Sequence, residues 1–136
     1  MSVSWKMEAG LNHVPAYQAS GKPYCSGAIN GSNAVGATYV TFPSVTRWVV
    51  VVNNDASNAA RVGFSKVGVC NSNYFTIGKA DASGKSRESL RLEVKTSQLW
   101  ISGSDNVDIV AGLTSVPSKR TSGSYGPNYS GSIGVG

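Results

Sequence analysis

The chain has 136 residues, which suits one domain rather than two. It holds 21 Ser, 16 Gly and 10 Asn, whereas Lys, Arg, Asp and Glu together supply 19 residues. Val occurs 17 times against 5 Leu and 5 Ile, and β-branched side chains pack better on strands than in helices. This composition excludes a helical bundle and predicts an all-β protein.

Segments in which apolar and polar residues alternate recur every eight to fifteen residues, with Gly, Ser, Asn, Asp and Pro between them. The predicted strands are Tyr24–Ile29, Thr38–Phe42, Val45–Asn53, Arg61–Ser65, Tyr74–Ile77, Ser89–Lys95, Gln98–Ser102 and Val107–Leu113. With no helix of any length between them, they predict a single eight-stranded antiparallel sandwich, and eight is the strand count of a jelly roll. The predicted divisions are an N-terminal arm, 1–20, the sandwich, 21–116, and a tail, 117–136.

Three segments carry more detailed predictions. The run Trp48–Val52 does not alternate, which predicts a central strand covered on both faces. The segment Ser89–Lys95 alternates, so we expect a half-buried strand with Leu90, Leu92 and Val94 on its buried face. The polar stretch Asn53–Asn58 predicts the wide loop of a hairpin.

The Gly- and Ser-rich tail has the composition of a segment that becomes ordered only against a partner. Its isolated aromatic residues, Tyr125 and Tyr129, are typical of side chains that anchor in a partner's groove. Trp48 and Trp100 stand among apolar neighbours instead, which favours the core or a subunit interface over a ligand-stacking platform.

Few residues are suited to catalysis or metal binding. His13 is the single histidine, and Cys25 and Cys70 stand 45 residues apart, which excludes a zinc site of ordinary spacing. Two buried free thiols are the more common arrangement, although a bridge between them stays open. Asp55 and Asp105 lie in polar loops that favour turns over calcium sites. We expect no enzyme activity, no cofactor and no metal.

The first ten residues contain no apolar run, so we expect neither a signal peptide nor a transmembrane segment. The net charge of +5 comes from scattered Lys and Arg residues. A scattered excess of this size reflects solubility rather than specific nucleic-acid binding.

An ordered set of short motifs resembles one known family. The motifs are Ser26-Gly27-Ala28-Ile29, Val45-Thr46-Arg47-Trp48-Val49-Val50-Val51-Val52-Asn53-Asn54, Arg61-Val62-Gly63-Phe64-Ser65 with Gly68-Val69, Asn73-Tyr74-Phe75, Leu99-Trp100-Ile101-Ser102 and Ile109-Val110-Ala111-Gly112-Leu113-Thr114. In this order, from about Ser26 to Pro117, they resemble the penton, or vertex, capsid proteins of large icosahedral double-stranded DNA viruses and of virophages.

The resemblance implies a single jelly roll that assembles as a homopentamer at the fivefold vertices of a virion. Its neighbours would be major capsid proteins and possibly minor ones, and no catalytic residue is implied. Candidate residues for contacts with other subunits or capsid proteins are Arg47, Arg61, Lys85, Arg87, Arg91, Tyr125 and Tyr129. We expect the tail to extend across an adjacent subunit.

The competing interpretation is a monomeric or trimeric β-sandwich that binds carbohydrate or a receptor. Such modules show an exposed aromatic platform or a calcium loop. The sequence gives neither feature clearly, so the vertex protein is the preferred interpretation.

Overall fold

The computed structural model describes residues 10–12, 14–16, 22–32 and 36–136. Most of the predicted N-terminal arm, with Trp5, His13 and Tyr17, lies outside these residues. A 3-10 turn, η2 Val14–Ala16, belongs to the part of the arm that is described. None of the described helices is long and apolar enough to cross a membrane.

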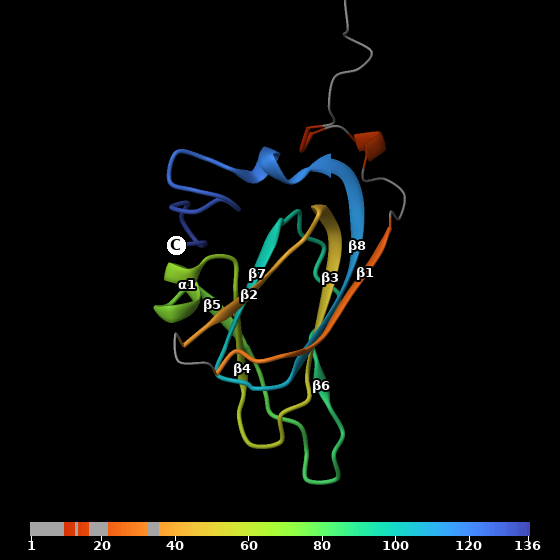
Figure 1. Cartoon of the computed structure of the whole chain (residues 1–136), viewed down its shortest axis with the longest axis vertical. Coiled ribbons are helices and arrows are strands. Elements are labelled where there is room, and N and C mark those ends of the chain that lie inside the picture. Colours follow the sequence, from red (N-terminus) through yellow and green to blue (C-terminus); the bar gives the residue numbers. More distant parts are fainter. Residues whose placement is uncertain (1–9, 13, 17–21, 33–35) are drawn as a thin grey trace, which may run out of the picture.

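Two antiparallel sheets of four strands form the body of the protein (Figure 1). Sheet A has the strand order β1-β8-β3-β6, and sheet B has the order β2-β7-β4-β5. The strands are β1 Pro23–Ile29, β2 Thr38–Thr41, β3 Ser44–Asn53, β4 Ala60–Gly63, β5 Tyr74–Ile77, β6 Arg87–Glu88, β7 Gln98–Ser102 and β8 Val107–Pro117. A short helix, α1 Lys66–Cys70, follows β4, and a 3-10 turn, η3 Ser118–Thr121, follows β8. The arrangement confirms the predicted all-β class.

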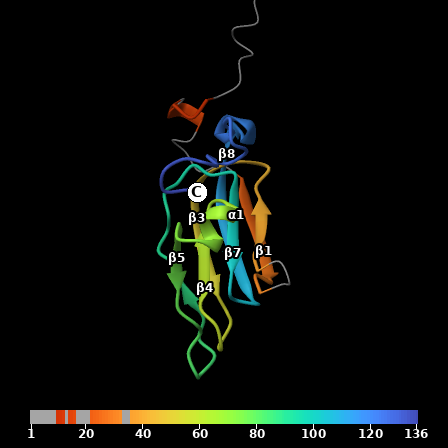
Figure 2. The same cartoon turned by 90° about the vertical axis from the view of Figure 1, so that its left-hand side faces the viewer.

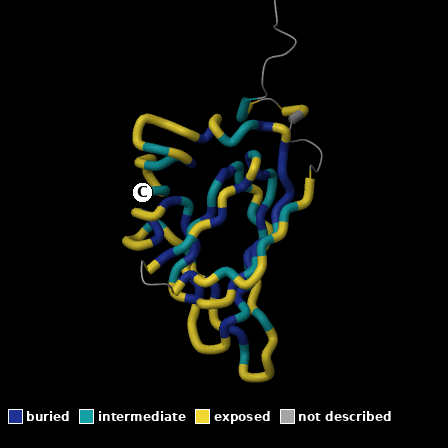
Figure 3. Tube along the Cα trace, viewed as in Figure 1, coloured by how far each residue is buried: buried dark blue, intermediate teal, exposed yellow. Residues whose placement is uncertain are grey.

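The core lies between the two sheets, because alternate residues of each strand point inward. Along β3, Val49 and Val51 are fully buried, whereas Val50 between them is half-buried. Leu99 and Ile101 of β7 enter the same core from sheet B. Burying one such side chain stabilises the fold by about 1.5–3 kcal/mol. Buried and less buried positions alternate along the strands in Figure 3.

Strand β3 lies inside sheet A, between β8 and β6, as its apolar run predicted. The prediction that both faces of Trp48–Val52 would be covered is wrong for the outer face. Only the inner side of sheet A has a facing sheet, so Trp48, Val50 and Val52 are half-buried at the surface.

The predicted strand Ser89–Lys95 is irregular. Ser89 donates its N–H to the carbonyl oxygen of Val51, and Leu92 donates to that of Val49, so three residues span the distance covered by two on β3. The additional residue shifts the alternation, as in a β-bulge. Leu90 therefore points outward and is 87% exposed, against the prediction that it would be buried.

The predicted hairpin at residues 53–58 is also wrong. Strand β3 belongs to sheet A and β4 to sheet B, so loop 54–59 crosses from one sheet to the other. It gathers with loop 78–86 at the lower end of the molecule in Figure 1. Sequence alternation alone does not distinguish a hairpin from such a crossover, because both place a polar loop between two strands.

The tail packs on its own chain. Asn128 is fully buried, and its Oδ1 accepts from the backbone N–H of Ser97 at 2.7 Å. Its Nδ2 donates to the carbonyl oxygens of Phe64 and Gln98 at 2.8 and 2.9 Å. The expectation that only a partner would order the tail is wrong. The Asn128 side chain forms hydrogen bonds with backbone groups near the end of β4 and the start of β7 in the same chain.

Candidate assembly interface

The outward side of sheet B carries a row of aromatic rings. The register places Tyr39 opposite Trp100, Trp100 opposite Gly63, and Gly63 opposite Tyr74. The rings of Tyr39 and Trp100 lie 4.7 Å apart, tilted by 32°. Gly63 itself is buried, because Val69 of α1 and the backbone of Asn73 pack closely over it. The four residues Tyr39, Trp100, Tyr74 and Arg61 are called the aromatic face below.

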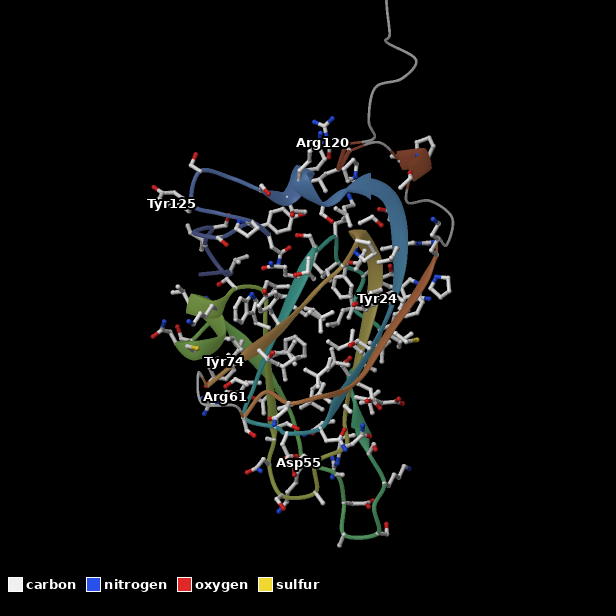
Figure 4. All side chains as sticks on the ribbon, in the orientation of Figure 1. Tyr24, Asp55, Arg61, Tyr74, Arg120 and Tyr125 are labelled. Carbon is white, nitrogen blue, oxygen red and sulfur yellow. The ribbon has the colours of Figure 1, made fainter. Side chains whose placement is uncertain are left out.

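Arg61 completes this face one step further along β4. Its guanidinium carbon lies 4.9 Å from the centre of the Tyr74 ring, within the range of a cation–π contact (Figure 4). Arg61 is exposed, and Tyr39 is 54% exposed. The aromatic face thus combines planar apolar rings with one fixed positive charge, a composition that is enriched at the centres of protein interfaces.

A hollow of about 540 Å³ adjoins the aromatic face. Figure 2 shows α1 standing in front of sheet B, and the tail closes the other side of the hollow. Tyr125 lines its rim and is 82% exposed. The hollow is lined by Tyr39, Ser65, Lys66, Val67, Gln98, Trp100, Tyr125, Pro127, Ser130, Gly131 and Gly136.

The outward side of sheet A is apolar at its centre. Val50 and Val110 lie opposite each other in the register of β3 and β8, and both are half-buried. Val52 follows Val50 on the same side of β3, and Trp48 precedes it. These four residues, Trp48, Val50, Val52 and Val110, are called the valine face.

The Trp48 ring occupies the space beside its cross-strand neighbour, which is a glycine. Gly112 lies opposite it on β8, and a methyl group at Gly112 would overlap the indole ring. Cys25 of β1 lies opposite Val110 and extends the same surface toward the edge of the sheet. An outer sheet face that faced only water would carry polar residues at these positions.

Two acidic residues stand at one end of the valine face. Glu88 and Asp108 lie on either side of Val52, from β6 and β8. The Asp108 carboxylate accepts the backbone N–H of Ala28 at 2.9 Å and the amide of Asn54 at 2.8 Å, which fixes its position. Glu88 is exposed. The valine face is therefore negative where the aromatic face is positive.

The structure separates the seven residues predicted for the interface. Arg61 and Tyr125 both lie on the sheet B side. Arg47 is half-buried on β3, and Arg91 pairs with Glu93 at 2.6 Å.

Lys85 lies in the β5–β6 connection and Arg87 begins β6, and both side chains are exposed. Tyr129 is half-buried, its hydroxyl donates to the carbonyl oxygen of Lys95 at 2.7 Å, and burial raises its pKa. Tyr129 therefore anchors the tail on its own chain, unlike the exposed Tyr125.

Tyr39 and Tyr74 were absent from the predicted set. The signal that identifies them is strand parity: Tyr39 precedes the buried Val40, and Tyr74 lies three residues before the buried Ile77. Both therefore point outward, and only an outward position leaves an aromatic ring available to a partner.

Asp55 stabilises the turn after β3, as its loop composition predicted. Its carboxylate accepts the backbone N–H groups of Ser57 at 2.7 Å and of Asp105 at 3.2 Å. The Ser57 contact lowers the pKa of Asp55 most, against a smaller opposing effect of burial. The side-chain contact with Asp55, followed by charge repulsion, raises the pKa of Asp105. Asp55 thus joins loop 54–59 to the β7–β8 connection.

The two thiols are free. Cys25 and Cys70 are both exposed, so the expectation that free thiols would be buried is wrong. Cys25 lies on β1 of sheet A and Cys70 ends α1 beside sheet B, so the fold holds them on different sides. Among the described residues, no group of three or more His, Cys, Asp or Glu is placed to hold a metal ion.

The chain was compared with known proteins. No protein-family model, no curated protein and no solved structure matches it.

Proposed function

We propose that the chain is a structural capsid protein that forms the pentameric vertex of an icosahedral virion, and that its fold is a jelly roll. The proposal assigns it no reaction, no cofactor and no nucleic-acid target. Its surroundings would be neighbouring major capsid proteins, and minor ones where present, as the sequence resemblance implies.

The observation that carries the proposal is the strand pairing. β1 pairs with β8, β2 with β7, β3 with β6 and β4 with β5, all antiparallel. Such nested pairs arise when one long hairpin of paired strands rolls into two sheets. This arrangement supports a jelly roll, an architecture that capsid proteins use.

A second observation supports a ring. The outer sides of the two sheets both carry apolar side chains, and they differ in residue type and charge. A closed ring of five uses a heterologous contact, in which two different surfaces of one subunit meet those of its two neighbours. A protein with two unlike apolar surfaces on opposite sides suits this requirement.

The aromatic face favours a second candidate function, a carbohydrate-binding sandwich. Exposed aromatic rings such as Tyr39, beside a hollow, offer a stacking surface for a sugar ring. This candidate gives no role to the valine face, so the vertex protein remains the main proposal.

The solution mass of the full chain distinguishes the two functions. A stable species of five times the 14.1 kDa chain mass is expected for the vertex protein. A monomer at all concentrations that binds an immobilised glycan panel would overturn it in favour of the carbohydrate-binding function. Antibody labelling of particles at their fivefold positions would then place the protein within the virion.

A further inference from the structure

We propose that the upper end of the sandwich binds an acidic segment of a neighbouring capsid protein. The upper end is the one at which β1 and β3 begin and β8 ends (Figure 1). This inference rests on the proposed function, because it gives the chemistry of the neighbour that a vertex protein meets. The binding site is a hollow lined by Lys22, Pro43, Ser44, Leu113, Thr114 and Ser115, and it is called the upper hollow below.

Irregular strand pairing opens the upper hollow, which has a volume of about 450 Å³. Ser44 pairs with Pro117 and Thr46 pairs with Leu113, so β8 advances by four residues where β3 advances by two. The additional residues of β8 leave the regular ladder, as in a β-bulge. Bulges of this kind are common beside functional sites, because they change the direction of side chains and of the strand.

Hydrogen bonds within the chain fix the shape of the upper hollow. The Thr114 hydroxyl donates to the carbonyl oxygen of Val45 at 2.6 Å and accepts the N–H of Val116 at 3.1 Å. Leu113, which is buried, and Pro43, which is exposed, give the hollow an apolar lining. The upper hollow is therefore a preformed seat for one apolar side chain of a partner.

Basic residues surround the upper hollow. The N–H of Leu113 donates to the carbonyl oxygen of Lys22 at 2.8 Å, which places Lys22 beside β8 on the β1 side. Arg47 lies on the β3 side of β8, next to the pairing of β3 with Leu113. The 3-10 turn η3, which follows β8, adds Lys119 and Arg120, both exposed. Positive charges thus flank the hollow on both sides and above it.

The acidic residues lie away from the upper end. Of the six in the part of the chain that the structure describes, the sixth, Glu93, pairs with Arg91 at 2.6 Å. Figure 4 shows Asp55 and Arg120 at opposite ends of the sandwich. The upper end therefore complements a negatively charged partner. The other five acidic residues stand at or near the lower end, and they are Asp55, Asp81, Glu88, Asp105 and Asp108.

An acidic protein segment suits the upper end better than nucleic acid or a second copy does. A phosphate backbone has no apolar side chain to fill the upper hollow. A second copy would present its lower end, where Lys79 and Lys85 stand among the acidic residues. In a fivefold ring all five upper ends lie at the same height along the axis, so they would form one ring of positive charge toward the neighbouring capsid proteins.

Peptide binding to the full chain tests the inference. The probe is a short fluorescent peptide that carries one leucine between runs of glutamate, and fluorescence anisotropy measures its affinity. Lys22→Glu reverses the charge at the upper hollow, and Ser115→Trp places a large ring at its rim. The matched controls are Lys79→Glu and Ala82→Trp, because both positions are exposed in the loop at the lower end. Circular dichroism checks that each variant keeps its fold.

We expect saturable binding by the wild type, affinity reduced at least about tenfold in each hollow variant, and wild-type affinity in both controls. Salt should weaken the binding, because it screens exposed charges. A peptide with serine in place of leucine should bind more weakly, because serine leaves the apolar lining uncovered. A photoreactive leucine analogue in the peptide should form cross-links with Lys22 or with residues 113–115.

The outcomes separate this inference from the proposed function. No saturable binding by the wild type, or unchanged binding by the folded Lys22→Glu variant, would overturn the inference and leave the pentameric vertex intact. Tighter binding of double-stranded DNA or of anionic lipid vesicles than of the peptide would also overturn it. Cross-links at other positions of the wild type would overturn it even if both hollow variants failed to fold. Sedimentation equilibrium tests the proposed function separately: a wild-type monomer that binds the peptide at the upper hollow would overturn the pentamer and support the binding site.

Discussion

Replacing Asn128 by alanine should release the tail from the sandwich. In the wild type, Oδ1 of Asn128 accepts from Ser97 N–H and from the Thr96 hydroxyl, both at 2.7 Å. Nδ2 donates to the carbonyl oxygens of Phe64 and Gln98. Alanine has no side-chain amide, so the variant would lose these four hydrogen bonds.

The cost can be estimated from these contacts. The Ser97 N–H and the carbonyl oxygen of Phe64 each lose a buried partner, which costs about 1 kcal/mol per group when water partly replaces it. The carbonyl oxygen of Gln98 keeps the Thr96 hydroxyl as a donor. Asn128 also has a φ of 53°, a left-handed conformation that costs alanine about 1 kcal/mol more than asparagine. The free energy of unfolding should fall by about 3 kcal/mol, a large part of the stability of a domain of this size.

Urea unfolding followed by tryptophan fluorescence measures this change, and limited proteolysis reports whether the tail is released. Ser124→Ala is the control, because Ser124 is exposed in the same tail and should change stability by less than about 0.5 kcal/mol. If Asn128→Ala lowered the free energy of unfolding by less than about 1 kcal/mol and the tail stayed protected, Asn128 would not be the anchor.

Four further substitutions test other parts of the structure. Gly68→Ala should expose the last residues to carboxypeptidase, because a methyl group there would overlap the carbonyl oxygen of Val135; unchanged digestion would contradict that contact. Gly112→Ala should displace the Trp48 ring, shift the tryptophan emission to the red and cost about 1–3 kcal/mol in urea unfolding. Asp55→Asn should lower the urea midpoint at pH 7, because the lowered pKa of Asp55 means that its charged form stabilises the fold. That stabilisation is lost as the carboxylate becomes protonated, so the midpoint of the variant should decrease less than that of the wild type below about pH 4. Asp105→Asn should instead raise the urea midpoint at pH 7, because the raised pKa of Asp105 means that its charged form lowers the stability of the fold. A lower midpoint would contradict the Asp55–Asp105 contact.

Period-2 alternation predicted most of the sheet. It placed Tyr74–Ile77 and Gln98–Ser102 at the observed bounds, because each strand has one side facing the core. It failed at Ser89–Lys95, where an additional residue opposite β3 reverses the parity of Leu90. Alternation reports which side of a strand is apolar, and it does not report a bulge.

Long-range pairing limited the prediction of the tail and of the candidate interface. The buried position of Asn128 depends on backbone groups of residues 64, 97 and 98, which no local pattern identifies. Arg61 was predicted from its charge, and strand parity places Tyr74 on the outward side, whereas the proximity of the two residues follows only from the pairing of β4 with β5. Residue type therefore suggested candidates, and strand register decided which of them share a surface.

The symmetry of the assembled protein tests the central proposal most directly. Electron microscopy of the purified full chain at high concentration should show closed rings with fivefold symmetry. Particles with twofold or threefold symmetry, or isolated monomers alone, would contradict the assignment of this protein to a pentameric vertex.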